Sequence, residues 1–91
     1  MARTVYLDGS RIRDRLSMSM YMNEIFSLPE HFGNTLEDLK QYLVGLNEDV
    51  TLNLSHECVQ EILANRYAFR VLLVLGRCAD ANSHLRIRFC R

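Results

Sequence analysis

Three segments of this chain alternate between apolar and polar residues, at about residues 5–7, 50–54 and 85–89. Alternation with a period of two is typical of β-strands that bury one face and expose the other. The intervals between the segments are too long for hairpins and carry helical patterns instead. Because strand–helix–strand connections join parallel strands, the pattern predicts an α/β fold with a small, mostly parallel sheet of three strands.

Two helices are predicted between the first two strands. The first covers residues 15–26 and has Met18, Met22 and Ile25 on one apolar side. This helix ends before Pro29, because the residue ahead of a proline is pushed out of helical geometry.

The second helix begins at Thr35, whose hydroxyl can cap the first free amides, and Asp38 completes a capping box. Leucines then recur at spacings of three and four residues, as in an amphipathic helix. They are Leu36, Leu39, Leu43 and Leu46. Glu37, Lys40 and Gln41 fall on the opposite side of the helix, so we expect them to face solvent.

After the second strand, Ser55 is a good N-cap for a third helix that carries Val59 and Ile62 and ends at Asn65. The next segment, residues 69–76, is apolar on every side and rich in β-branched residues. Taken alone it is typical of a buried strand, but a short apolar run does not distinguish a strand from a buried helix by its period.

The composition fits one domain covering residues 1–91, with 48% apolar residues and a formal net charge of zero. A neutral chain has no bulk field that recruits nucleic acid or an acidic membrane, so direct nucleic-acid binding is not expected. The N-terminus lacks a signal-peptide pattern, and no stretch approaches the roughly 20 apolar residues of a membrane helix. We expect a cytoplasmic protein that is monomeric.

The candidate chemical groups point to no catalytic or metal site. His31, His56 and His84 are not spaced as ligand pairs, and none lies beside a cysteine at zinc spacing. Cys58 and Cys78 have no neighbouring base that would activate a thiol, so a structural role is the better interpretation. Three cysteines at irregular spacing also argue against a secreted disulfide framework. We therefore expect no enzyme activity, no metal and no cofactor.

A basic group is predicted on the polar side of the sheet, from Arg86, Arg88 and Arg91 together with Arg3. A solvated sheet face is the usual explanation. The alternative is a second contact surface, which would make the chain a nucleic-acid-binding or regulatory module. The apolar run at residues 71–75 would favour weak self-association if part of it lies outside the core.

Ahead of the second helix, a proline stop, an aromatic residue and a glycine form the pattern Leu-Pro-x-aromatic-aromatic-Gly, with His31 at the first aromatic position. The residues that carry the pattern are Leu28, Pro29, Glu30, Phe32, Gly33, Leu36, Glu37, Leu39, Leu43 and Gly45. The pattern resembles the barstar family of intracellular ribonuclease inhibitors. The resemblance implies a three-stranded, mostly parallel sheet with four helices packed on one face. It also makes residues 67–81 a helix and not a strand.

In that family the loop and helix plug the active site of a ribonuclease, where acidic side chains pair with basic catalytic groups. The resemblance therefore implies an immunity-type inhibitor from a bacterial toxin–antitoxin pair, which binds an RNase-type toxin through residues 28–41. The implied contact residues are His31, Phe32, Gly33, Thr35, Glu37, Asp38, Gln41 and Arg77. Phe32 would supply apolar contact, and Glu37 and Asp38 would take basic groups. The alternative is that these two acids only offset the positive end of the helix, by about 0.3–1 kcal/mol each.

Besides His31 at an aromatic position and Thr35 in place of an asparagine cap, three positions depart from the family pattern. Lys40 stands where a tryptophan is usual, and Gln41 stands where the family has its acidic anchor. Arg77 aligns with an interface acid on the fourth helix and reverses its charge. These departures predict poor binding to the family's usual nuclease and favour a different partner.

Overall fold

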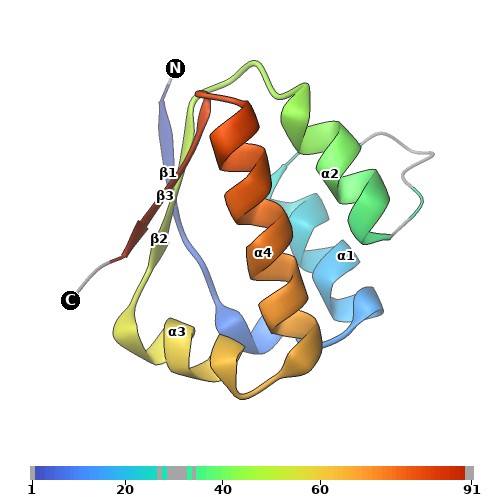
Figure 1. Cartoon of the computed structure of the whole chain (residues 1–91), viewed down its shortest axis with the longest axis vertical. Coiled ribbons are helices and arrows are strands. Elements are labelled where there is room, and N and C mark those ends of the chain that lie inside the picture. The colour runs from blue at the N-terminus through green and yellow to red at the C-terminus, as the bar shows by residue number, and fades with distance from the viewer. Residues whose placement is uncertain (1, 27, 29–32, 34, 90–91) are drawn as a thin grey trace.

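The computed structural model describes residues 2–26, 28, 33 and 35–89. In this part of the chain, three strands form one sheet in the order β1–β2–β3. The elements are β1 (Arg3–Tyr6), the 3₁₀ helix η1 (Gly9–Arg11), α1 (Arg15–Ile25), α2 (Leu36–Val44), β2 (Val50–Leu54), α3 (His56–Leu63), α4 (Arg66–Ala81) and β3 (Leu85–Phe89). Figure 1 shows the four α-helices on one side of the sheet. The predicted α/β fold is confirmed.

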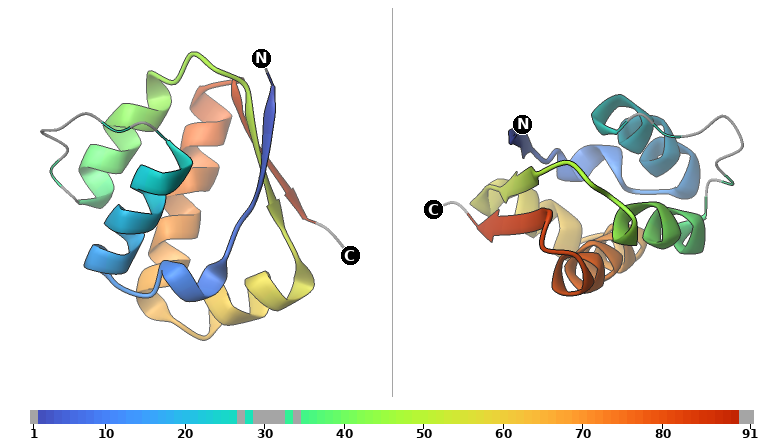
Figure 2. Two further views of the ribbon diagram at one scale, coloured as in Figure 1. Left: turned by 180° about the vertical axis from the view of Figure 1, so that it is seen from behind. Right: turned by 90° about the horizontal axis from the view of Figure 1, so that it is seen from above.

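Both strand pairs of the sheet are parallel, and β2 lies in the centre. Val50, Leu52 and Leu54 of β2 are almost fully buried, so one face of the sheet packs against the helices. Since side chains alternate along a strand, Thr51 and Asn53 point to the other face. Thr4 and Tyr6 of β1, and Arg86 and Arg88 of β3, are paired with these two residues and point to the same face. The sheet therefore has one face in the core and one face that no described helix covers (Figure 2).

Each α-helix begins with a side chain that accepts a hydrogen bond from the amide three residues later. The N-caps are Asp14, Thr35, Ser55 and Asn65. Thr35 and Ser55 were predicted in this role. Asn65 was expected to end the third helix, but that helix ends at Leu63, and Asn65 begins α4 after a single turn residue, Ala64. The amide of Ala68 donates to the Asn65 side chain at 2.9 Å.

Residues 69–76 are helical, as the family resemblance implied, and the strand alternative is wrong. α4 buries one stripe, formed by Ala68, Val71, Leu75 and Cys78. Phe69 and Leu73 are 41% and 46% exposed, on the opposite side. Apolar residues on the solvent side hide the helical period, which explains the ambiguity. The exposed apolar group of this segment is thus Phe69 with Leu73, because Val71 and Leu75 belong to the core.

Asn82 joins the ends of three elements. This buried side chain donates from Nδ2 to the main-chain oxygens of Leu43, Val44 and Leu46, at 3.0, 3.3 and 2.8 Å. Its Oδ1 accepts from the amide of His84 at 3.0 Å. One side chain therefore fixes the C-terminal end of α2 against the end of α4 and the start of β3.

Candidate protein-binding surface

Helix α2 is anchored at both ends. At its start, Thr35 Oγ1 accepts from the Asp38 amide at 3.1 Å and donates to Asp38 Oδ2 at 2.6 Å. Thr35 thus caps the helix as predicted, but the Asp38 carboxylate bonds the Thr35 hydroxyl and not the Thr35 amide, so only half of the predicted capping box forms. At its end, Asn82 binds the last carbonyl groups. Leu39 and Leu43 are fully buried between these points, so the opposite side of α2 is held on a rigid support.

The outward side of α2 carries Glu37, Lys40, Gln41 and Val44, all of them exposed, as the leucine spacing predicted. Glu37 lies in the first turn and makes no hydrogen bond or salt bridge with any described residue. Its carboxylate is therefore available to a partner. Lys40 lies three residues further along the same side, so the surface displays both signs of charge.

Asp38 differs from Glu37 because its carboxylate is already engaged. The residue is half-buried, and its Oδ2 accepts the hydrogen bond from Thr35. Gly33 also packs directly on this group, since a Cβ atom at Gly33 would lie 2.9 Å from the Asp38 Cγ. Any larger residue at Gly33 would displace the carboxylate. Asp38 thus serves the helix cap, and Gly33 provides the space for it.

Arg77 lies on α4, which runs beside α2 (Figure 1). The guanidinium side chain is exposed. The next residue, Cys78, reaches α2, where its thiol contacts the main-chain oxygen of Lys40 at 3.8 Å. Arg77 directly precedes Cys78, so it lies at a similar level of α4 but about 100° around the helix from Cys78. We call Glu37, Lys40, Gln41, Val44 and Arg77 the α2–α4 surface.

His31 and Phe32, the other two residues predicted to contact a partner, lie outside the described residues. The same holds for Pro29 and Glu30 of the family-like pattern. Their expected roles therefore stay predictions. The described part of the predicted interface consists of Leu28, Gly33 and residues 35–41, with Arg77 from α4.

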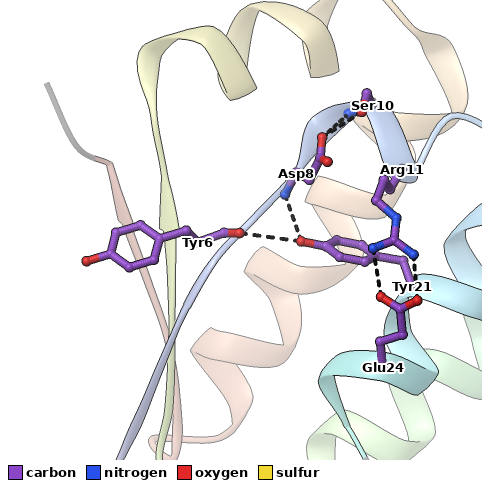
Figure 3. Close-up of polar contacts among 6 residues, drawn as sticks. All are labelled: Tyr6, Asp8, Ser10, Arg11, Tyr21 and Glu24. Atoms are coloured by element: carbon purple, nitrogen blue, oxygen red, sulfur yellow. Dashed lines mark hydrogen bonds and ion pairs between the residues drawn. The ribbon is translucent and has the colours of Figure 1, made fainter.

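A second polar cluster joins β1, η1 and α1, and the sequence analysis did not predict it (Figure 3). The Tyr21 hydroxyl accepts from the Asp8 amide at 2.9 Å and donates to the Tyr6 carbonyl at 3.4 Å. Arg11 packs over the Tyr21 ring, 4.5 Å from its centre, and donates two 2.7 Å hydrogen bonds to Glu24. These partners lie 13 to 15 residues apart, and no local sequence pattern marks such pairs.

The electrostatics of this cluster indicate a structural brace. Burial raises the pKa of Tyr21, so the phenol stays protonated and keeps its hydrogen bonds. The hydrogen bonds between Arg11 and Glu24 lower the pKa of the carboxyl and raise that of the guanidinium. Both groups are charged at neutral pH and are paired with each other. The cluster therefore ties the first strand to α1 and presents no unpaired acid or base.

The cysteines and histidines of the described residues show no catalytic arrangement. Cys58 and Cys78 are buried free thiols, and burial raises the pKa of both, which disfavours the reactive thiolate. His56 is exposed at the start of α3, and His84 donates to Asp49 at 2.7 Å. Within the described ranges, no three His, Cys, Asp or Glu side chains come together as metal ligands.

No family model matches the chain, and no curated protein sequence matches it. In the part of the chain that the structure describes, none of the helices has the length and apolar character needed to cross a membrane. The functional inference therefore rests on the residues and their geometry.

Proposed function

We propose that this chain is a non-enzymatic, barstar-like inhibitor that occludes the active site of an RNase-type toxin through residues 28–41, with Arg77 at the rim. The observation that carries the proposal is the exposed Glu37 carboxylate, which no described residue pairs, on a helix anchored at both ends. The resemblance of residues 28–45 to the barstar family supports the choice of a ribonuclease as the partner.

Anchoring of α2 favours tight binding. A side chain on a fixed helix loses less conformational freedom on association than one on a loose loop. A carboxylate that meets an arginine makes charge-assisted hydrogen bonds, which are stronger than neutral ones. Opposite charges across an interface also speed the encounter. Glu37 is thus in a position to reach the basic groups with which a ribonuclease binds phosphate.

The α2–α4 surface also limits which partner fits. Lys40 and Arg77 are exposed and add two positive charges to the α2–α4 surface, where Glu37 carries the single available carboxylate. A partner must therefore present a basic group opposite Glu37 and acidic groups opposite Lys40 and Arg77. Charge complementarity of this kind excludes partners with like charges at the same places. The proposed toxin accordingly has a mixed-charge rim around a basic centre.

The test compares Glu37→Lys with Glu57→Lys, a matched control. Glu37 and Glu57 are both exposed acids in the first turn of a helix, and both follow the N-cap by two residues. The wild-type chain and both variants are titrated into a panel of purified small ribonucleases, with a fluorogenic RNA as substrate. We expect stoichiometric inhibition of one enzyme. Glu37→Lys should raise its Kd at least tenfold, about 1.4 kcal/mol, through faster dissociation, and Glu57→Lys should leave it unchanged.

Thermal unfolding of the two variants provides the folding control. Each substitution places a cation at the positive end of a helix, so each should lose roughly 0.3–1 kcal/mol of stability, and to a similar extent. Equal inhibition by the wild type and Glu37→Lys would contradict the proposed interface. Inhibition of no ribonuclease in the panel would contradict the proposed class of partner.

A further inference from the structure

The sheet face turned away from the helices is open, although parallel sheets are normally covered on both faces (Figure 2). We call its outward positions the open sheet face. They are Thr4, Tyr6, Thr51, Asn53, Arg86 and Arg88. Paired residues of parallel strands point to the same side. The register therefore gathers these side chains, from three strands, on one surface.

The open sheet face has two rows across the strands. Tyr6, Asn53 and Arg88 are paired abreast in one row, and the row before it runs from Thr4 to Arg86. Neighbouring strands lie about 4.8 Å apart, so each row spans roughly 10 Å. Tyr6 is 75% exposed, and its ring points away from the helices (Figure 3). A flat polar surface thus has an aromatic ring at one edge and arginines at the other.

The charges on this face are of one sign. Arg86 and Arg88 are exposed, and neither forms a salt bridge with a described residue. Asp49 lies close enough to feel the charge of Arg86, but its carboxylate accepts a hydrogen bond from His84. None of the six outward positions is acidic. This face is therefore locally positive, although the net charge of the whole chain is zero.

Arg3, which was also expected on this face, does not contribute to it. The register pairs Arg3 with Val50, which places Arg3 on the helix side of the sheet, where it forms a 2.7 Å salt bridge with Glu48. Arg91 lies outside the described residues. Among the described residues, the positive charge of this face thus comes from β3.

Asn53, at the centre of the row, holds an unsatisfied acceptor. Its Oδ1 atom is buried and has no hydrogen-bond partner among the described residues. Buried polar atoms are nearly always paired, so an orphan calls for an explanation. Because this atom is buried, a donor from a bound molecule between Tyr6 and Arg88 would reach it only after the Asn53 side chain turned outward.

We infer that the open sheet face binds a short segment of single-stranded nucleic acid. A base can stack on the exposed Tyr6 ring, and phosphates can bind Arg86 and Arg88. The edge of a base can donate to Asn53 Oδ1 once this side chain turns outward. A second copy of the chain fits less well, because the face offers little apolar area apart from Tyr6. An acidic peptide would satisfy the arginines and leave the ring unused. This surface is separate from the α2–α4 surface and goes beyond the proposed inhibitor function.

The test measures anisotropy of a fluorescein-labelled RNA of about 10 nucleotides at several salt concentrations. The logarithm of the binding constant is plotted against the logarithm of the salt concentration. Each phosphate contact of a single strand contributes about −0.7 to the slope, so two contacts predict a slope of about −1.4. Arg88→Ala removes one of these contacts and should make the slope less negative by about 0.7. Tyr6→Ala should weaken binding about fivefold or more, the loss expected for one stacked base.

Two variants on the other side of the molecule are the controls. Arg70→Ala removes an exposed arginine of α4, and Glu37→Lys changes the proposed inhibitor surface. Both should leave RNA binding unchanged, and circular dichroism checks that each variant folds. Absence of saturable binding at 50 mM salt and 100 μM protein would overturn the inference. So would an equal loss in Arg70→Ala, or full competition by polyglutamate with no effect of Tyr6→Ala. Each of these outcomes leaves the ribonuclease assay unaffected.

Discussion

Asn82 shows how much of this fold depends on one polar side chain. It lies between α4 and β3, yet it binds the carbonyl groups at the end of α2. Main-chain oxygens at the end of a helix lack intrahelical partners, and when buried they need donors from elsewhere. The Asn82 amide supplies those donors, and Asn82 Oδ1 also takes up the amide of His84.

Asn82→Ala should destabilise the protein by roughly 2 kcal/mol or more, because it leaves several buried polar groups without partners. The measurement is urea unfolding followed by circular dichroism. Ser83→Ala is the control, since Ser83 is the exposed neighbour and its truncation should stay within about 0.5 kcal/mol. A loss in Asn82→Ala no larger than that of the control would show that the amide does not hold α2.

At the scale of residues, the sequence predicted which side chains follow a helical period. It did not predict the side chains that form hydrogen bonds between distant elements. Glu37, Lys40 and Gln41 face outward because the leucines on the other side of α2 recur with a helical period. Asn82 and Tyr21 gave no such signal. Their hydrogen-bond partners lie from 2 to 39 residues away, and only the folded chain brings them together.

Among the elements, α2 depends most clearly on a local signal at its start. Thr35 and Asp38 bond each other reciprocally at the first turn, where amides would otherwise be unpaired. The cap also fixes the direction of the turn that carries Glu37. A looser first turn would leave this carboxylate less ordered in the free protein.

Thr35→Ala should cost about 1 kcal/mol of unfolding free energy, the usual value of an N-cap. It should also weaken partner binding, because the first turn of α2 would have to become ordered on association. Thr35→Ser keeps a hydroxyl and is the matched control. Chemical denaturation and the ribonuclease titration measure the two effects. A Thr35→Ala protein as stable as Thr35→Ser would contradict a capping role.

The hydrophobic period alone predicted the strands and three of the helices. It did not predict the two other elements, α4 and η1. α4 has Phe69 and Leu73 exposed opposite its buried stripe, so no polar side revealed the helix. η1 covers only Gly9–Arg11, too short to repeat any pattern. A Cβ at Gly9 would lie 2.9 Å from the carbonyl oxygen of Cys58, so glycine is required there by the approach of α3. That contact is tertiary and leaves no mark in the neighbouring sequence.

For the molecule as a whole, three carboxylates make the unfolding free energy depend on pH. The amide of Ser17 lowers the pKa of Asp14, which caps α1. Hydrogen bonds from Arg11 and His84 lower the pKa of Glu24 and Asp49. The native state therefore binds protons less readily than the unfolded chain. The stability that these groups contribute is complete above the ordinary carboxyl pKa of about 4 and is lost as the pH falls through the lower native values.

We therefore expect the unfolding free energy to fall between about pH 5 and pH 2.5, measured by urea titration at successive pH values. Asp14→Asn is the diagnostic variant, because asparagine also caps a helix but does not titrate. Its stability should fall less steeply over this interval than that of the wild type. Identical slopes for the two proteins would show that Asp14 is not among the coupled groups.

The hydrogen bonds from Asn82 to the end of α2 also determine when, during synthesis, α2 can become fixed in place. A ribosome makes the chain from its N-terminus, so α2 leaves the exit tunnel well before the residue that completes its end. Until Asn82 follows, the carbonyl groups of Leu43 and Leu46 lack the donor that Asn82 supplies, and β2 lacks its neighbour β3. A nascent protein halted after β2 therefore has the α2 residues of the α2–α4 surface without their support, and it lacks Arg77. We therefore expect the chain to become able to bind a partner late in translation, in the single step in which Asn82 and β3 join the fold.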